Sequence, residues 1–151
     1  MKLISKNKIA YRDYQFDKDY EVGIVLVGHE VKSIKMGQVN IKDAMVRIKD
    51  RELWIKNMDI PLYKKTNPKL VPDYKAKGDR KLLINKRELA KISAMTDKPG
   101  YVIIPLEIYL NKRGLIKLKI AIGKLMRKVE KKQVLKEKDI KRQMDRDIRN
   151  Y

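Results

Sequence analysis

The spacing of apolar positions changes part-way through the stretch 20–36, around which the rest of the chain is organised. Its first half is a largely apolar, β-branched run, which is typical of a buried strand. The run breaks at Gly28, and Val31 and Ile34 then follow three residues apart, as on one face of a short amphipathic helix that Gly37 ends. The two lysines of this helix lie on another face that can stay in water: Lys32 and Lys35.

Alternation of apolar and polar residues predicts a hairpin over 43–58. Every second residue from Ala44 to Ile48 is apolar, and the alternation resumes at Leu53. The two-residue polar break at 50–51 has the length of a tight hairpin turn. Arg51 stands where Gly would be preferred, so the sequence leaves the turn type open.

Three further strands and a second helix follow. The helix runs from Asn85, a residue that favours the helix N-cap, to about Ala94, with Glu88 at the reciprocal capping-box position. Pro105 interrupts one of the strands and suggests either a sheet edge or a bulge. The strands are predicted at 81–84, 101–110 and 115–122.

Two segments lack a regular pattern. Residues 1–14 are polar and basic, and we expect an ordered basic arm that leads into the first strand. The stretch 61–79 contains three of the five prolines, and its charge comes mostly from lysine. Long loops in compact domains are usually functional or mobile, and a disordered connector is an equally good interpretation here.

This order of elements predicts a fold that is mainly β with flanking helices. About six short strands and two modest helices occur without the alternation of βαβ units. Such a set of antiparallel strands favours a closed or nearly closed barrel, and an OB-fold-like antiparallel barrel is the leading interpretation. We expect one domain over residues 1–123, formed by this barrel and the basic N-terminal arm.

The composition shifts after Gly123, and residues 124–151 form a basic C-terminal tail. This tail has eleven Lys or Arg and five Asp or Glu, with no Gly or Pro. Ile140, Met144 and Ile148 recur every four residues, but such a helix alone is marginal in water. We expect the tail to be helical or disordered, either ordering when it binds a partner or docked on the barrel as a solvated helix.

Charge is the most unusual property of the chain. Its 151 residues contain 38 Lys or Arg against 19 Asp or Glu, giving a net charge of +19 and a pI of about 10.0. This excess favours an anionic partner, either nucleic acid, a ribonucleoprotein or an anionic membrane surface. An AT-rich genome would also enrich lysine, but it does not account for the low number of acidic residues.

Several classes of function are excluded or disfavoured by what the chain lacks. Without Cys it has no disulfides, thiolate metal sites or Cys nucleophile, and its single histidine, His29, has no nucleophile-elbow motif beside it. The acidic residues are scattered among lysines, so an enzyme such as a nuclease is a poor interpretation. The sequence has no membrane-spanning run and no secretion signal, which predicts a soluble protein in a reducing compartment.

Several short motifs occur in a fixed order along residues 7–124. The central one is Glu30-Val31-Lys32-Ser33, then Gly37, then Asn40-Ile41-Lys42-Asp43. The flanking motifs are Asn7-Lys8 with Ala10, Tyr20-Glu21-Val22-Gly23-Ile24, Arg80-Lys81-Leu82-Leu83 with Lys86-Arg87-Glu88-Leu89, and Ala121-Ile122-Gly123-Lys124. In order and spacing, this set resembles the SmpB family of SsrA-binding (tmRNA-binding) proteins.

This resemblance implies an OB-fold barrel that binds the tRNA-like domain of tmRNA and enters the vacant A site of a stalled ribosome in trans-translation. It implies no cofactor, metal or small-molecule substrate, and we expect a monomer that does not bind membranes. The expected RNA-binding residues are Asn7, Lys8, Glu21, Glu30, Lys32, Ser33, Lys35, Arg80, Lys81, Leu83 and Lys124. In the tail, the expected ribosome contacts near the decoding centre are Arg127, Lys128, Lys131, Lys132, Lys138, Lys141 and Arg142.

Each of these residues also has a simpler interpretation. Glu30 can stabilise the start of its helix, and Leu83 is expected in the core more than at a contact. Tyr63 is the aromatic residue that we would test as a stacking platform. A generic OB-fold protein that associates with RNA or ribosomes is the alternative function, and it predicts stacking aromatics on the barrel face.

The chain departs from the family pattern in three places. His29 follows Gly28 where the family usually has Thr or an aromatic residue, and Asp59 replaces a common His. After Lys124 the chain lacks the usual Asp-Lys-Arg motif, which leaves the role of the tail in the decoding centre open. We expect a cytoplasmic location, with an organelle of bacterial descent, such as a plastid, and a missing transit peptide as the alternative.

Overall fold

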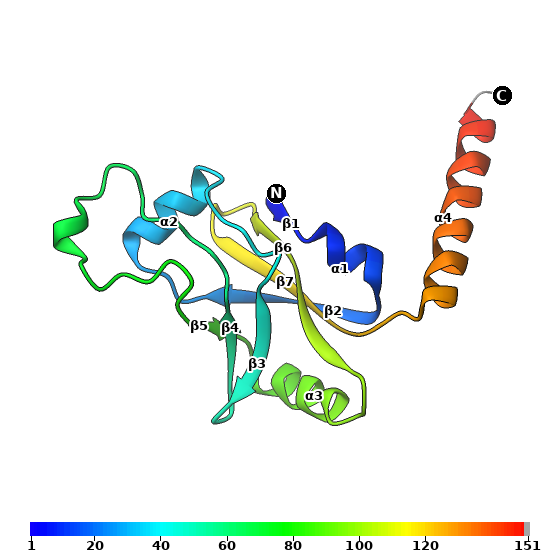
Figure 1. The fold of residues 1–151 in the computed structure, drawn as a ribbon, viewed down its shortest axis with the longest axis horizontal. Helices are drawn as coiled ribbons and strands as arrows, with labels where there is room; N and C mark the ends of the chain where they lie inside the picture. Colours follow the sequence, from blue (N-terminus) through cyan, green and yellow to red (C-terminus); the bar gives the residue numbers. More distant parts are fainter. Residues whose placement is uncertain (150–151) are drawn as a thin grey trace.

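The computed structural model describes residues 1–149, apart from the side chains of 128–131, 134 and 149. This part of the chain contains seven strands and four α-helices. Figure 1 shows a β-rich body with one helix projecting from it. The elements are β1 (Lys2–Lys6), α1 (Lys8–Asp13), β2 (Tyr14–Ile24), α2 (Gly28–Lys35), β3 (Met45–Lys49), β4 (Glu52–Lys56), the 3₁₀ turn η1 (Pro68–Leu70), β5 (Arg80–Leu83), α3 (Lys86–Thr96), β6 (Val102–Leu110), β7 (Ile116–Leu125) and α4 (Lys128–Arg149).

Six of the described strands pair in a closed cycle. The order β6-β3-β4-β5-β2-β7 returns to its start because β7 also pairs with β6, and β1 adds to β6 outside the cycle. Every pairing is antiparallel. The β3–β6 ladder consists of one residue pair, Val46 with Ile103, so the cycle is weakly joined there. The predicted mainly β class is confirmed, and the cycle agrees with a barrel.

The core lies inside this cycle and follows the predicted alternation of β7. Leu118, Ile120 and Ile122 are buried and belong to the main apolar cluster. Ile34 from α2 and Ile92 from α3 are each fully buried in the same cluster. Burying an aliphatic side chain of this size contributes about 1.5–3 kcal/mol, so each helix is held to the barrel by its apolar face.

A smaller apolar cluster lies on the outer face of β6 and β7 beneath α1. It contains Ala10 of α1 with Ile104, Leu106 and Ala121. The N-terminal segment is ordered, and residues 2–13 form a strand paired with β6 and a helix packed on the sheet. The apolar side chains of this segment fall in two short runs, Leu3-Ile4 and Ile9-Ala10-Tyr11, which show neither the strand nor the helix period.

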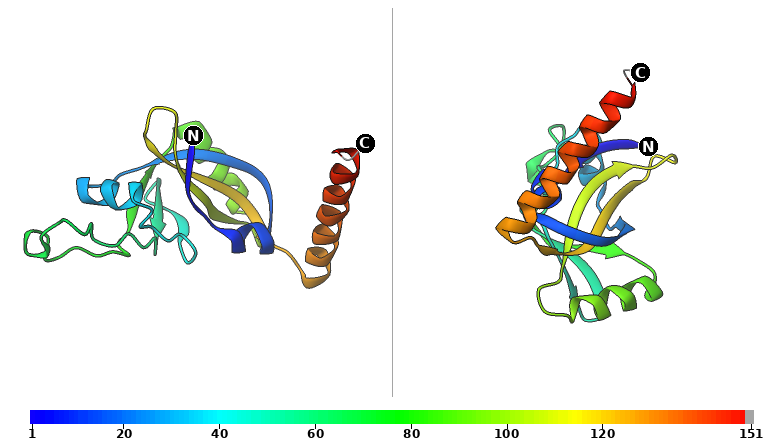
Figure 2. Two further views of the ribbon diagram at one scale, coloured as in Figure 1. Left: turned by 90° about the horizontal axis from the view of Figure 1, so that it is seen from above. Right: turned by 90° about the vertical axis from the view of Figure 1, so that its right-hand side faces the viewer.

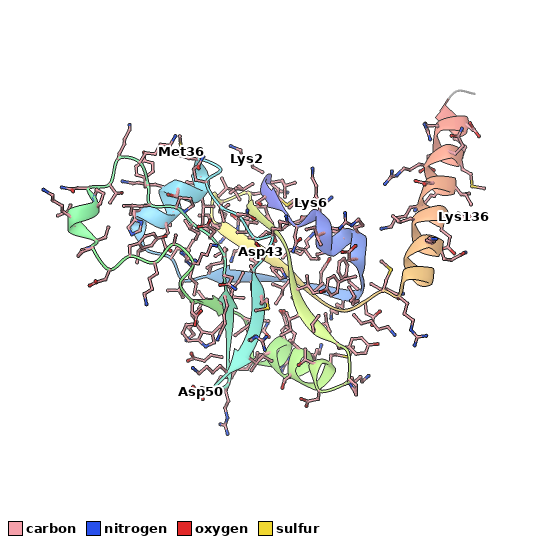
Figure 3. All side chains as sticks on the ribbon, viewed as in Figure 1. Lys2, Lys6, Met36, Asp43, Asp50 and Lys136 are labelled. Carbon is pink, nitrogen blue, oxygen red and sulfur yellow. The ribbon has the colours of Figure 1, made fainter. Side chains whose placement is uncertain are left out.

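The hairpin turn and the proline-containing strand resolve two open points. Asp50 and Arg51 have φ values of 52° and 62°, which are the left-handed values of a type I′ turn. Figure 3 shows Asp50 at the tip of this hairpin. Pro105 lies at a register shift between β6 and β7. Of the two alternatives predicted for this proline, the bulge is therefore confirmed and the sheet edge is wrong, because β6 is a central strand.

The C-terminal tail is an α-helix over the described residues. The expected domain boundary at 123/124 falls inside β7, which continues to Leu125. The first residue after this strand, Met126, is buried and donates its N–H to the Asp13 carbonyl at 2.8 Å. Beyond it, α4 stands apart from the barrel in Figure 1 and in the left view of Figure 2. Ile140 and Met144 are exposed along it. No helix in residues 1–149 is both long enough and apolar enough to cross a membrane.

Candidate nucleic-acid interface

The outer faces of β5, β2 and β7 bring several predicted site residues together. Gly23 pairs with Leu83 on one side and with Lys117 on the other, and Glu21 pairs with Lys119. Since paired residues point to the same face, these side chains share one surface, which we call the sheet face (Glu21, Gly23, Leu83, Lys117 and Lys119).

Leu83 is the apolar centre of the sheet face. Its side chain is 53 % exposed, so the expectation of a core residue is wrong; the neighbouring Leu82 occupies the core instead. A methyl group on Gly23 would lie 3.3 Å from the Leu83 Cβ, so the missing side chain gives Leu83 room. An exposed leucine between lysines and a carboxylate is suited to packing against an unstacked base.

Two tyrosine–carboxylate pairs fix the acidic side of the sheet face. Tyr109 donates its hydroxyl hydrogen bond to Glu21 Oε2, and Tyr11 donates to Glu107 Oε1 at 2.7 Å. Lys119 Nζ lies 3.8 Å from Glu107 Oε2. Burial raises the pKa of both tyrosines, and the hydrogen bonds to the carboxylates raise it further. The hydroxyls therefore remain protonated donors that orient the carboxylates.

Of the Asn7-Lys8 motif, only the lysine faces water. Asn7 is 6 % exposed; its Oδ1 accepts from the Ala10 N–H at 3.2 Å, and its Nδ2 donates to the Pro105 carbonyl at 3.0 Å. The side chain thus caps α1 and ties it to β6. Lys8 is exposed beside it, and Lys124 is exposed with its Nζ 5.9 Å from the centre of the Tyr101 ring.

Besides Asn7, three further predicted RNA-binding residues are inside the protein. Glu30, Ser33 and Arg80 are 6 %, 1 % and 6 % exposed, and Arg80 Nε donates to Glu30 Oε2 at 2.6 Å. Ser33 donates its hydroxyl to the Pro61 carbonyl at 2.7 Å. These residues build the surface and do not line it. The simpler interpretation of Glu30 is confirmed, because its Oε1 accepts from the Val27 N–H at the start of α2.

The Arg80 guanidinium has hydrogen bonds for all five of its donors. Beyond the bond to Glu30, it donates to the carbonyls of Met58, Ala76 and Gly78 at 2.6–3.2 Å. The remaining bond is to the hydroxyl of Tyr74 at 3.2 Å, which itself donates to the Ile60 carbonyl at 2.6 Å. We call Glu30, Tyr74 and Arg80 the Arg80 network. It joins α2 to both ends of the loop 61–79.

The lysines near the Arg80 network differ in their exposure to water and in their contacts. Lys32 and Lys35 are exposed on α2, and Lys32 Nζ lies 5.8 Å from the centre of the Tyr63 ring. Lys81 is half-buried, with its Nζ 3.2 Å from Glu52 Oε1. The ring of His29 meets Tyr74 edge-on, and within the described residues its buried Nδ1 has no hydrogen-bond partner.

The predicted tail residues lie on or just before α4. Figure 3 shows the position of this helix through Lys136, well away from the barrel. Lys128 and Lys131 have side chains outside the described residues. The other five predicted tail residues are exposed: Arg127, Lys132, Lys138, Lys141 and Arg142.

Sequence reasoning missed two lysines of the sheet face and three residues that support its acidic side. Lys117 and Lys119 alternate with the buried residues of β7, so the pattern contained a signal for both. Tyr11, Tyr109 and Glu107 could not be found this way, because their pairing depends on contacts between distant strands. No group of three or more potential metal-binding side chains occurs in the part of the chain that the structure describes.

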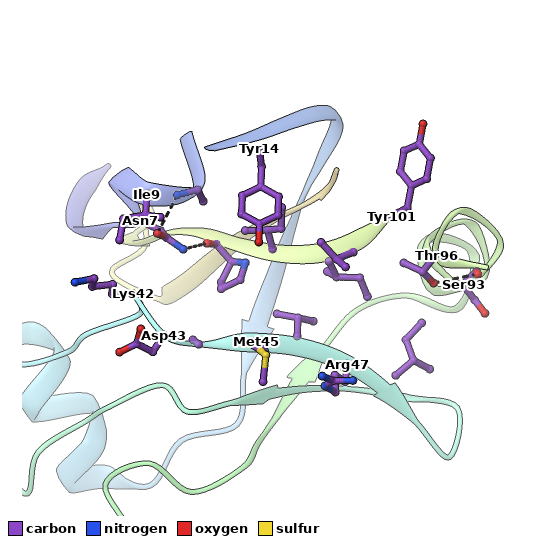
Figure 4. Close-up of a pocket in the computed structure, with 18 of the residues that line it drawn as sticks. Asn7, Ile9, Tyr14, Lys42, Asp43, Met45, Arg47, Ser93, Thr96 and Tyr101 are labelled. Atoms are coloured by element: carbon purple, nitrogen blue, oxygen red, sulfur yellow. Dashed lines mark hydrogen bonds between the residues drawn. The ribbon is translucent and has the colours of Figure 1, made fainter. Parts of the chain in front are cut away.

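A groove of about 720 Å³ opens where β3 and β6 diverge. Figure 4 shows Tyr14 above it and Lys42 and Asp43 at one end, with Tyr101, Ser93 and Thr96 at the other. Most of its lining is apolar and belongs to the barrel seam. Of the predicted RNA-binding residues, only Asn7 lines this groove, and Asn7 is buried. The groove is therefore separate from the exposed predicted contacts.

Comparisons with known proteins agree over almost the whole length. An SsrA-binding protein of Coprothermobacter proteolyticus is 45 % identical over 97 % of each chain. Those of Persephonella marina and Phocaeicola vulgatus are 44 % and 41 % identical, over 97 % and 93 % of this chain and 93 % and 92 % of theirs. A chain from a solved structure concerning tmRNA-SmpB and the bacterial ribosome matches with a TM-score of 0.66 and 32 % identity, over 87 % of this chain and 93 % of that one.

The family assignment rests on both sequence and structure. The model of the SmpB protein family matches residues 4–150, which include part of β1 at one end and all of α4 at the other. The matches therefore extend past the barrel to the tail, where the sequence departs from the family motif. The chain belongs to the SmpB family.

Proposed function

We propose that this chain binds the tRNA-like domain of tmRNA and delivers it to stalled ribosomes in trans-translation. The relatives are named for binding SsrA, and the structural neighbour concerns tmRNA-SmpB and the bacterial ribosome. The observation that carries the proposal is the sheet face, where Leu83, Glu21 and Lys119 come together from three strands.

The predicted RNA-binding residues divide into two groups in this proposal. The exposed or half-exposed ones contact RNA: Lys8, Glu21, Lys32, Lys35, Lys81, Leu83 and Lys124. The lysines contact backbone phosphates, while Glu21 accepts hydrogen bonds from a guanine edge or a ribose hydroxyl. The buried ones hold the contacts in place: Asn7, Glu30, Ser33 and Arg80.

We propose that the tail acts on the ribosome. Its cations are presented along α4, which projects from the barrel and leaves the sheet face free for tmRNA. The family's usual Asp-Lys-Arg motif is absent, so this chain would use the cations of α4 in its place.

The proposed activity is binding without catalysis, by a monomer in the bacterial cytoplasm, where ribosomes are found. A role in an organelle of bacterial descent is the alternative location. A generic RNA- or ribosome-associated barrel is the alternative function. It predicts that all RNAs bind equally well, by charge alone.

A salt-dependent binding titration tests the proposal. The tRNA-like domain of tmRNA competes with elongator tRNA and unstructured RNA for the full chain and for a chain ending at Arg127. This end point keeps Met126, which is buried against the body of the protein, so the truncation removes α4 alone. Preference for the tRNA-like domain that survives truncation supports the proposal. Equal affinity for every RNA and collapse on truncation would refute it.

A further inference from the structure

The loop 61–79 is an unusually basic segment that the sheet face does not use. It contains five lysines against two aspartates, and all five lysines are exposed: Lys64, Lys65, Lys69, Lys75 and Lys77. None of them is among the sequence-predicted contacts. The loop and α2 occupy one end of the molecule and α4 the other in both Figure 1 and Figure 2.

Buried polar side chains hold the base of this loop in place by hydrogen bonds. The Arg80 network holds the carbonyls of Met58, Ala76 and Gly78, and the Ile60 N–H donates to the Ala76 carbonyl at 3.0 Å. Ser33 adds a hydrogen bond from α2 to the Pro61 carbonyl. The two ends of the loop are thus joined to each other and to α2, as in a compact Ω-type loop.

The beginning of the loop lies against α2. Lys32 Nζ is over the Tyr63 ring, and the exposed Lys64 and Lys65 follow Tyr63 directly, so basic residues of the helix and of the loop meet here. Like charges repel, and a loop that only connects two strands gains nothing from being held against a cationic helix face. An anionic ligand that bridges the two elements offsets this repulsion.

The side chains available point to phosphates rather than to bases. The Tyr63 ring is covered by Lys32, and the Tyr74 hydroxyl is engaged in the Arg80 network. The loop therefore offers no free aromatic platform for single-stranded bases. Leu70 is its one exposed large apolar side chain among the described residues, which is little for insertion into a membrane.

We propose that the lysines of the loop 61–79 extend the basic face of α2 into a second RNA-binding surface, apart from the sheet face, which recognises the phosphate backbone of helical RNA. The Arg80 network pre-organises the surface, so that little loop entropy is lost on binding. The proposal does not depend on which RNA the sheet face selects.

Two charge-matched triple variants test the surface in the full-length chain. The first replaces Lys64, Lys65 and Lys69 by glutamine. The second replaces three exposed lysines by glutamine, one on the hairpin, one on α3 and one in the turn after α3, which costs the same net charge: Lys49, Lys91 and Lys98. Affinity for a 20-base-pair RNA duplex and for the tRNA-like domain is measured against salt concentration.

The loop variant should bind the duplex about tenfold more weakly at low salt, and the slope of log affinity against log salt should fall by about 2 to 3. The control triple should change neither by much. Equal effects of both triples would show that only net charge matters and would overturn the proposal, as would no effect of the loop triple. An effect confined to binding of phosphatidylglycerol vesicles would overturn it in favour of a membrane.

The Tyr74→Phe variant tests pre-organisation while keeping every positive charge. It removes the hydroxyl that bonds to the Ile60 carbonyl and accepts from Arg80. Duplex affinity should fall several-fold with an unchanged salt slope, because the phosphate contacts stay the same in number. A changed slope would contradict the proposed role of the network. If the unmodified chain fails to prefer the tRNA-like domain over the duplex, the function proposed for the sheet face fails, while the loop is still judged by its salt slope.

Discussion

Replacing Arg80 by methionine removes a cation from the interior while keeping most of the side-chain volume. The substitution deletes all five guanidinium hydrogen bonds, and Glu30 remains as a carboxylate that is 6 % exposed and has lost its counter-ion. The carbonyls of Met58 and Ala76 also lose their side-chain donor. The change therefore tests whether the network stabilises the whole fold.

Breaking a buried ion pair by removing one partner typically costs about 3–5 kcal/mol, because the remaining charge is uncompensated. We expect Arg80→Met to destabilise the chain by this amount. Glu30→Gln should cost less, since four of the five arginine donors keep their oxygen acceptors and the glutamine can still accept from the Val27 N–H. The double variant should cost less than the sum of the two, because neither buried charge then remains.

Urea denaturation followed by circular dichroism measures these free energies of unfolding. Arg87→Met on α3 is the matched control, since this arginine is exposed, and it should change the stability by less than about 0.5 kcal/mol. A loss below about 1 kcal/mol for Arg80→Met, or strict additivity in the double variant, would refute the reasoning.

Three further outcomes follow from individual residues. Gly123→Ala should cost about 2 kcal/mol or more in urea denaturation, because a Cβ there would collide with the backbone oxygen of Gln15, which cannot rotate away. Leu83→Ser should leave stability within about 0.5 kcal/mol but weaken binding of the tRNA-like domain about tenfold in the titration above, since the side chain is exposed on the sheet face. In an alkaline absorbance titration, Tyr11 and Tyr109 should ionise above the ordinary tyrosine pKa of about 10, and each Phe variant should reduce the late phase, to which Tyr74 also contributes because burial raises its pKa. Because the folded-state pKa is raised, the stability they contribute is fully present below pH about 10 and is lost as pH rises toward the raised pKa; wild-type stability that stays constant across that range would contradict this.

Local patterns were enough for the elements whose stabilising contacts are local or strictly periodic. Asn85 was predicted as a helix cap, and its Oδ1 accepts from the Glu88 N–H at 2.8 Å. The expected reciprocal bond differs in detail, since Glu88 Oε1 accepts from the side-chain amide of Asn85 rather than from its backbone. Gly37 was predicted to end its helix and has a φ of 79°, with the Gln38 N–H returning to the Ser33 carbonyl.

The features that depend on distant contacts could not be predicted in the same way. Glu30 and Arg80 are fifty positions apart in the sequence, and nothing in either local pattern reports that they meet in the interior. Charged residues are normally exposed, and the family resemblance implied both as RNA-binding residues without showing that they are buried. The N-terminal strand and helix were missed for the same reason, because β1 is held by β6 and α1 by the cluster around Leu106.

The signature of α2 illustrates how one short helix serves both the interior and the surface. At 3.6 residues per turn, Glu30 and Ser33 face the base of the loop, Ile34 enters the core, and Lys32 lies outward. The residues that carry the family resemblance here are therefore not all contacts; the buried ones determine where the exposed lysine is held. It follows that Arg80→Met should weaken RNA binding without removing any proposed phosphate contact. A lower affinity with an unchanged salt slope would distinguish this loss of position from a loss of charge.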